Sequence, residues 1–309
     1  MAIRLGLSLP QARQYDLGRD VPDVARTAER IGYQSLWVYE RALFPDSPTQ
    51  GLGGMEGVPW PDQYRGVPEP LVTLTLAAAV TERAELGTSV LVAPLHGPFQ
   101  LARSLATLDA ASGGRVVAGL GTGWSHDEYA AAGVAPFAER GRVLDEIIDV
   151  CRAVWGPDPV RYEGRYTTIA PATVGPKPAR PIPVLLPAYS RRAMVRLVDR
   201  ADGWMPIAMT GAEQLAAEWR QLRDLAAERG RTRPIRASVR VNAQYTAKAY
   251  DGADRAPFQG SVDQLVEDLV AHAGTGLEEF FFDLQGGMRD AQLKDVAAEL
   301  FETARAAGV

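Results

Sequence analysis

The sequence has little of the chemistry that builds disulfides or metal centres. Its 309 residues include one cysteine, Cys151, and three histidines, His96, His126 and His272. A single cysteine excludes an internal disulfide and a cysteine-based metal site. Three histidines spread along the chain do not suggest a zinc cluster either. We therefore expect no metal site.

A strong excess of charge and long apolar runs are also missing. The chain has 38 acidic and 33 basic residues, a net charge of −5, which gives no general attraction for nucleic acid or anionic membranes. No apolar run approaches the roughly 18 residues of a membrane span, and the apolar run at the start is too short for a signal peptide. We expect a soluble cytoplasmic protein with a small-molecule substrate and no nucleic-acid or membrane partner.

What the sequence does have is a regular alternation of strand and helix patterns. Eight short apolar segments have the character of buried strands, and residues with helical spacing separate them. The expected strands are Ile3–Leu9, Ser35–Tyr39, Leu86–Val92, Arg115–Leu120, Pro183–Leu186, Gly203–Ile207, Ile235–Tyr245 and Glu279–Leu284. Eight such units predict an α/β fold, a (β/α)8 TIM barrel that forms a single domain over residues 1–309, rather than a two-domain doubly wound enzyme.

Two stretches of 27 residues interrupt the alternation, 42–68 and 156–182. The first is rich in glycine and proline and follows the second strand. The second is rich in proline, precedes the fifth strand and contains a possible hairpin at Val160–Ile169. Without both, the chain has the length of an ordinary barrel, about 250 residues. Long loops are usually functional, and active sites of barrels lie at the carboxyl ends of the strands, so 42–68 is expected to cover an active site.

Several motifs are specific enough to indicate a family. They are SLWVYER after the first helix, GTSVLV, SGGRVVAGLGTGW, YEGRY, PKPARPIPVLLPAYSRRA and DGWMP. Together they resemble the bacterial luciferase-like superfamily of flavin and deazaflavin oxidoreductases, whose fold is an α/β barrel. The chain is more similar to the branch that uses coenzyme F420, a deazaflavin, than to the luciferases or the alkanesulfonate monooxygenases.

The resemblance implies an enzyme that transfers hydride between F420 and a small organic substrate, with the hydride chemistry belonging to the cofactor. Two alternatives stay open. One is an FMN-dependent monooxygenase that needs a partner flavin reductase, and the other is a flavin-binding barrel without catalytic activity. The family commonly dimerises, so a homodimer is possible.

The resemblance also assigns residues that contact the flavin ring. In the GLGTGW run it implies ring and ribityl contacts from Gly121, Thr122, Gly123 and Trp124, although an ordinary strand-to-helix turn also accounts for the glycines. It further implies a non-proline cis peptide between Ser89 and Val90, next to Thr88, that bulges against the back of the ring. The alternative for these three residues is packing within the barrel.

A phosphate site is expected after the fifth strand. Ser190 suits the N-cap of the next helix, and helix N-termini bind phosphate. The resemblance places the cofactor phosphate at this turn, which makes Ala188, Tyr189, Ser190 and Arg191 the candidates, against the alternative of an ordinary capped helix. Family members often have a Gly-Gly-rich turn here, and this chain does not. The basic residues Arg192, Lys177 and Arg180 are further candidates to hold the anionic tail of F420.

The candidate catalytic residues are Glu40 and His96. Tyr39 and Glu40 end the second strand, where Tyr39 is expected to contact the cofactor and Glu40 to contact the ring edge or relay a proton. Many family members carry a histidine at the next position, which is Arg41 here. His96 lies just beyond the third strand and has an ordinary pKa suited to acid–base chemistry.

The alternatives without a catalytic role are a surface ion pair at Glu40–Arg41 and a structural loop histidine at His96. Trp60 and Tyr64 in the first long loop either line the substrate pocket or anchor the loop. We expect His126 to be solvated, His272 to be structural and Cys151 to be buried.

Overall fold

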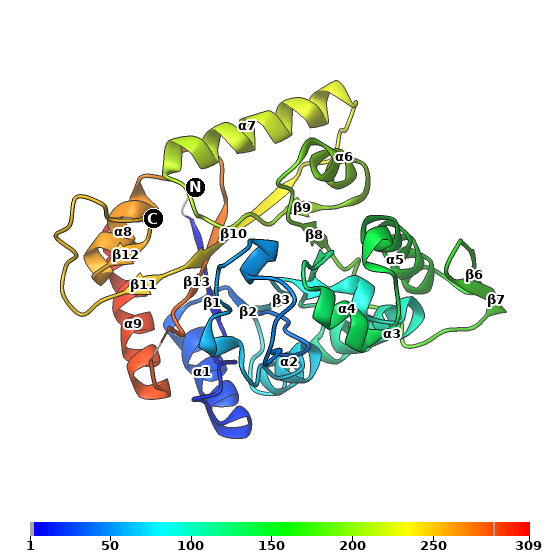
Figure 1. Ribbon diagram of the computed structural model, residues 1–309, viewed down its shortest axis with the longest axis horizontal. Helices are drawn as coiled ribbons and strands as arrows, with labels where there is room; N and C mark the ends of the chain where they lie inside the picture. Colours follow the sequence, from blue (N-terminus) through cyan, green and yellow to red (C-terminus); the bar gives the residue numbers. More distant parts are fainter. Residues whose placement is uncertain (1–2, 287) are drawn as a thin grey trace.

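The structure is a computed structural model that describes residues 3–286 and 288–309. Within them, eight parallel strand positions close into a barrel (Figure 1), which confirms the predicted fold. Their order is β3, β2, β1, β13, β10, β9, β8 and β5, and β5 pairs again with β3. The bounds are β1 Arg4–Ser8, β2 Ser35–Val38, β3 Glu85–Thr88, β5 Val116–Gly121, β8 Val184–Leu186, β9 Gly203–Trp204, β10 Arg236–Asn242 and β13 Glu279–Asp283.

Two predicted strands are divided in the structure. The third consists of β3 and β4 (Leu91–Val92), separated by a cis peptide between Ser89 and Val90. The prediction of that cis bond is confirmed. The seventh consists of β10 and β11 (Gln244–Tyr245), and β11 pairs with β12 (Gln259–Gly260) outside the barrel.

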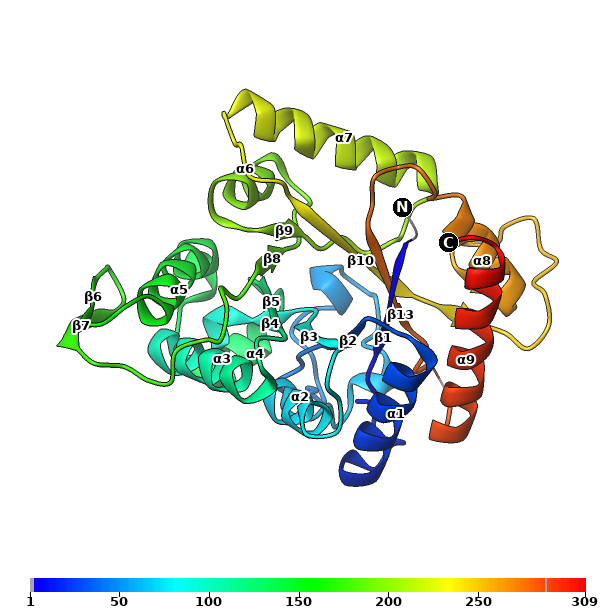
Figure 2. The same cartoon turned by 180° about the vertical axis from the view of Figure 1, so that it is seen from behind.

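Helices cover the outside of the barrel in both views (Figure 1, Figure 2). They are α1 Leu17–Ile31, α2 Pro70–Ala78, α3 Pro98–Ser112, α4 His126–Ala132, α5 Arg140–Trp155, α6 Arg191–Arg200, α7 Ala212–Glu228, α8 Val262–Val270 and α9 Asp290–Ala306. The apolar stripe that predicts α5, which includes Ile147, Ile148 and Cys151, is fully buried against its neighbours. Over the described residues, no helix has both the length and the apolar character needed to cross a membrane.

Bulky side chains fill the middle of the barrel. Trp37 and Phe281 stack with ring centroids 4.4 Å apart, and both are fully buried. Val117, Leu185 and Met205 complete this layer. The interior is therefore a packed core, as in barrels generally, and ligands can enter only at the ends of the strands.

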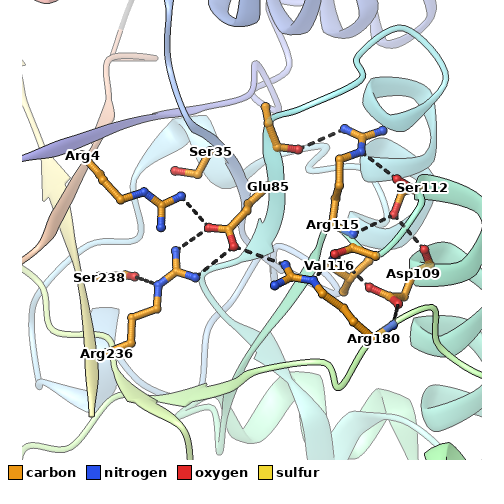
Figure 3. A network of polar contacts seen from close by, with 12 residues as sticks. Arg4, Ser35, Glu85, Asp109, Ser112, Arg115, Val116, Arg180, Arg236 and Ser238 are labelled. Atoms are coloured by element: carbon orange, nitrogen blue, oxygen red, sulfur yellow. Dashed lines mark hydrogen bonds and ion pairs between the residues drawn. The ribbon is translucent and has the colours of Figure 1, made fainter. Parts of the chain in front are cut away.

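An ionic network closes the amino ends of the strands (Figure 3). The Glu85 carboxylate lies 2.7 Å from Nη2 of Arg4 and 2.6 Å from Nη2 of Arg236. Arg236 also reaches the buried carboxylate of Glu279 at 2.6 Å. Burial would raise the pKa of Glu85, but the hydrogen bonds and charges of Arg236 and Arg4 lower it to about 2. Because this end is occupied by ion pairs, the carboxyl ends of the strands are left for a ligand.

The insertion 42–68 lies at those carboxyl ends. It contains two 3₁₀ turns, Leu52–Gly54 and Asp62–Tyr64. Its Thr49 backbone N–H donates to Asp127 of α4 at 3.0 Å, and the Gln50 amide donates to the carbonyl of Trp124. The loop is therefore fixed to the segment that follows β5.

The insertion 156–182 leads instead to the amino ends of the strands. It forms a hairpin of β6 (Val160–Glu163) and β7 (Thr168–Ala172) that projects beyond α5 (Figure 2). Lys177 then pairs with Asp158 at 3.0 Å, and Arg180 lies 3.3 Å from Glu85 in the network at the amino ends. The expectation that Lys177 and Arg180 hold a cofactor tail is therefore wrong. The insertion precedes β8, so it must end where that strand begins.

Candidate functional site

A cavity of about 450 Å³ opens at the carboxyl ends of β2, β4, β5, β8, β9 and β10. Most of the residues predicted from the sequence line it: Tyr39, Glu40, Ser89, Val90, Gly121, Thr122, Gly123, Trp124, Tyr189 and Ser190. They come from four separate stretches of the chain that only the barrel brings together. Its position agrees with the general location of ligand sites in this architecture.

Thr88, Ala188, Arg191 and His96 do not line the cavity. Thr88 is fully buried, and its hydroxyl donates to the carbonyl of Gly119 at 2.8 Å, which ties β3 to β5. Ala188 is buried beneath its turn. The Arg191 side chain is 60% exposed and lies 3.4 Å from Glu228 at the end of α7. These three positions therefore have structural or surface surroundings rather than cavity contacts.

His96 acts on the cavity only through Glu40. The Glu40 carboxylate is buried, and its Oε2 accepts from the Val92 backbone N–H at 2.6 Å, while its Oε1 lies 2.7 Å from Nε2 of His96. Burial would lower the pKa of His96, but the hydrogen bond and the charge of Glu40 raise it above its ordinary value. The pair connects the cavity to a histidine whose side chain is 25% exposed, so a proton can pass between cavity and solvent.

The glycines of the GLGTGW run let β5 approach the bulge after β3. A Cβ on Gly121 would lie 2.5 Å from Cγ2 of Val90, and a Cβ on Gly119 would meet the backbone carbonyl of Thr88. Gly123 has φ +66°, a left-handed conformation that favours glycine. The run thus places Val90 in the floor of the cavity and turns the chain to bring Trp124 into its wall.

The turn before α6 supplies donors at the rim. The Ser190 hydroxyl accepts from the Ala193 backbone N–H at 3.3 Å, and both residues line the cavity. The first-turn N–H groups of a helix have no partner within the helix and attract anions. The Tyr189 hydroxyl accepts from the Ile207 backbone N–H at 3.3 Å and links this turn to the segment after β9.

Sequence reasoning missed Arg240, which is central to the site. Its Nη1 donates to the carbonyl of Ser89 at 2.6 Å, its Nη2 to Asp283 at 2.7 Å and its Nε to Asn242 at 2.7 Å. The guanidinium also lies 5.1 Å from the ring centre of Tyr39. The sequence contains a signal for Arg240. Polar residues occupy alternate positions of this apolar strand, which is the spacing of residues that share one face: Ser238, Arg240 and Asn242.

The sequence presents Arg41 as a departure from the family pattern, or as half of a surface ion pair with Glu40, yet its side chain is largely buried and lines the cavity. Its side chain is 9% exposed, its Nη1 lies 3.1 Å from Glu128, and its guanidinium lies 4.9 Å from the ring centre of Trp124. Of the two aromatic residues left open, Tyr64 lines the cavity. Trp60 is buried against Trp124, with ring centroids 4.7 Å apart, and anchors the loop.

The donor set suits an organic cofactor better than a metal. No three histidine, cysteine, aspartate or glutamate side chains gather as possible ligands in residues 3–286 and 288–309. The cavity has apolar lining from Val90, Met205 and Ile207, and a rim at Ser190 and Ala193, where α6 begins. A flat ring fits the apolar lining, and a phosphate fits the rim at the start of α6.

The sequence matches known proteins along most of its length. A family model described as luciferase-like monooxygenase matches residues 5–304. An uncharacterized protein of Mycobacterium tuberculosis is 36% identical over 197 residues, which are 62% of this chain and 68% of that protein. The F420-dependent glucose-6-phosphate dehydrogenase of Amycolatopsis mediterranei is 31% identical over 199 residues, 63% of this chain and 55% of the relative.

Solved structures share the fold. The monooxygenase RslO1 from Streptomyces bottropensis superposes with a TM-score of 0.78 at 19% identity, covering 99% of this chain and 100% of that one. An F420-dependent secondary alcohol dehydrogenase in complex with an F420-acetone adduct gives a TM-score of 0.72 at 16% identity, with coverage of 99% and 100%. At these identities the likeness concerns the architecture alone.

Proposed function

The chain belongs to the luciferase-like monooxygenase family, and from this premise we propose that it is an F420-dependent oxidoreductase that exchanges hydride with a small organic substrate. The observation that carries the proposal is the composition of the cavity. Its apolar side at Val90 and Met205 and its rim at Ser190, where α6 begins, lie together at the carboxyl ends of the barrel strands.

The choice of F420 over FMN rests on the named relatives. The F420-dependent glucose-6-phosphate dehydrogenases of Amycolatopsis mediterranei and Kineococcus radiotolerans are 31% and 32% identical to this chain over 199 and 179 residues. Both cofactors share the tricyclic ring, the ribityl chain and the first phosphate, so the cavity itself suits either. The relatives support the deazaflavin.

The residues of the chain have separate tasks in this proposal. F420 supplies the hydride chemistry when it is bound. Val90 supports one face of the ring, and the first-turn N–H groups of α6 bind its phosphate. Trp124 and Tyr64 close the cavity from the side of the loop 42–68 and exclude water. Excluding water protects a hydride donor and strengthens the polar contacts inside.

Glu40 and His96 move the proton that accompanies the hydride. Glu40 lines the cavity, and its Oε1 contacts His96 at 2.7 Å. A carboxylate and an imidazole at this distance can pass a proton between the substrate and solvent. Arg41 cannot take this task, because a guanidinium stays protonated at physiological pH.

The proposal is tested by the chromophore that the protein retains. We expect protein purified from a deazaflavin-producing host to carry F420, identified by its absorption spectrum and mass. Bound FMN, with oxygen consumption by the protein and reduced FMN, would support the monooxygenase alternative instead. Failure to bind either compound at micromolar concentration would leave a barrel without catalytic activity.

A further inference from the structure

Arg41 presents a charged donor to the cavity that the proposed function leaves unused. Its Nε donates to the carbonyl of Glu40 at 2.6 Å, and its Nη1 faces Glu128 at 3.1 Å. Nη1 is buried and meets Glu128 as an ion pair without a hydrogen bond in the part of the chain that the structure describes. Because Arg41 lines the cavity, its guanidinium is within reach of a bound molecule.

The guanidinium is held in place before any ligand arrives. Its centre lies 4.9 Å from the ring centre of Trp124, 5.7 Å from that of Tyr64 and 6.0 Å from that of Trp60. On its other side, Glu128 is almost fully buried and is fixed by the Ala42 backbone N–H at 2.8 Å. An arginine held this way loses little conformational entropy on binding, which favours affinity.

The other charged side chains of the cavity are committed to the protein. Both carboxylate oxygens of Glu40 have partners, Val92 and His96. All three guanidinium nitrogens of Arg240 donate, to Asn242, Ser89 and Asp283. The charged group best placed to meet a ligand is therefore the Arg41 guanidinium, whose ion pair with Glu128 has no hydrogen bond.

We propose that Arg41 selects substrates that carry a carboxylate, one oxygen of which accepts a hydrogen bond from its guanidinium. The inference rests on the proposed function, which places the substrate in the same cavity as the ring. A volume of about 450 Å³ is near the low end for ligand cavities, so little space remains beside the ring. Tyr39 and Tyr64 line the cavity, and their aromatic rings favour a flat apolar body. The substrate class is a small unsaturated or aromatic carboxylate.

The proposal is tested by equilibrium titration with matched probes on protein with and without F420. The probes are crotonate and benzoate and their uncharged amides, crotonamide and benzamide, followed by tryptophan fluorescence and calorimetry. We expect at least one carboxylate to bind tenfold tighter than its amide. We expect the preference for the acid over its amide to be no larger than this, because Glu128 offsets part of the charge of Arg41. Equal binding of every acid and its amide, or no binding of either acid, would overturn the inference.

Three variants assign the preference to Arg41. Arg41→Gln should abolish the difference between acid and amide, and Arg41→Lys should retain part of it. Arg191→Gln is the matched control, an exposed arginine near the rim that does not line the cavity, and it should leave the preference intact. Thermal melting of each variant checks that it folds.

The outcomes separate this inference from the proposed function. If the unaltered protein does not bind F420, the proposed function is contradicted. The comparison of acid and amide on protein without F420 still tests Arg41 in that case. An unchanged preference in Arg41→Gln contradicts the inference. So does a loss of F420 affinity in Arg41→Gln greater than twofold, because Arg41 would then serve the cofactor.

Discussion

Glu40 and His96 form the residue-scale feature on which proton transfer depends. Their contact of 2.7 Å raises the pKa of His96 above its ordinary value of 6.5 even though burial acts in the opposite direction. A raised pKa means that the folded protein holds this proton more tightly than the unfolded chain. The stabilising contribution is therefore complete below pH 6.5 and is lost as the pH rises through the folded-state pKa.

Glu40→Gln should lower the pKa of His96, because the variant keeps the burial and removes the negative charge. The measurement is an NMR pH titration of the histidine ring protons. His272 is distinguished by a pKa that burial lowers to about 4. Glu69→Gln is the control, since the charge of Glu69 raises the pKa of His96 less than Glu40 does, and it should shift His96 much less. Equal effects of the two substitutions would show that the Glu40 contact is not the cause.

Single residues were predictable where the chain places them at the end of a strand. Tyr39 and Glu40 follow from that rule, Val90 and Trp124 from the resemblance to the family, and all four line the cavity. Arg191 did not, because its position at the start of a helix does not determine where a long side chain points. Its guanidinium lies along the surface toward Glu228.

At the scale of elements, the barrel depends on close contacts between strands and the large rings inside it. Gly87 of β3 faces the ring of Trp37, and a Cβ at this position would overlap the indole. Trp37 in turn stacks on Phe281 at 4.4 Å, so it cannot move away without disturbing β13. The strand can therefore carry no side chain at position 87.

Gly87→Ala should destabilise the protein by about 1–3 kcal/mol, the usual cost of overpacking a core. Chemical denaturation measures the free energy of unfolding. Gly18→Ala is the matched control, because Gly18 is exposed in the first turn of α1 and nothing but the Asp16 side chain lies within 4 Å of its Cβ position. It should be neutral or stabilising by up to about 1 kcal/mol. A similar loss of stability in both variants would contradict the packing argument.

The elements themselves were largely predictable, because buried parallel strands are short apolar runs and the helices show clear 3.6-residue spacing. The predicted strand Gly203–Ile207 was too long. The strand β9 ends at Trp204, and Pro206 two residues later has no N–H to continue the ladder. An isolated bridge between Ile207 and Arg240 extends the pairing.

For the whole molecule, the amino end of the barrel is held by charges that come from distant parts of the chain. Arg4, Glu85, Arg236 and Glu279 each lie at the start of a strand (Figure 3 shows the first three). Sequence patterns could not predict this network, since nothing local relates residues 81 or 151 positions apart. Only closure of the barrel makes them neighbours.

Stability should fall in acid as this network is protonated. The folded-state pKa of Glu85 is about 2 against an ordinary 4.5. Its contribution to the free energy of unfolding is therefore complete above pH 4.5 and is lost as the pH falls toward 2. The shift corresponds to about 3 kcal/mol. Glu85→Gln should therefore lower the stability at pH 7 and flatten its decline between pH 4.5 and 2, measured by denaturation at a series of pH values.

The matched control for Glu85→Gln is Glu56→Gln, which removes an exposed carboxylate in the loop 42–68. It should leave both the stability at pH 7 and its decline in acid unchanged. If Glu85→Gln behaved in the same way, the network would contribute nothing to acid stability.

The function of the whole molecule depends on which cofactor the cavity at the other end of the barrel holds. Equilibrium titration of the cofactor-free protein with F420 and with FMN tests this most directly. F420 should bind at least tenfold more tightly, a difference of about 1.4 kcal/mol. Equal or tighter binding of FMN would contradict the assignment of the protein as an F420-dependent oxidoreductase.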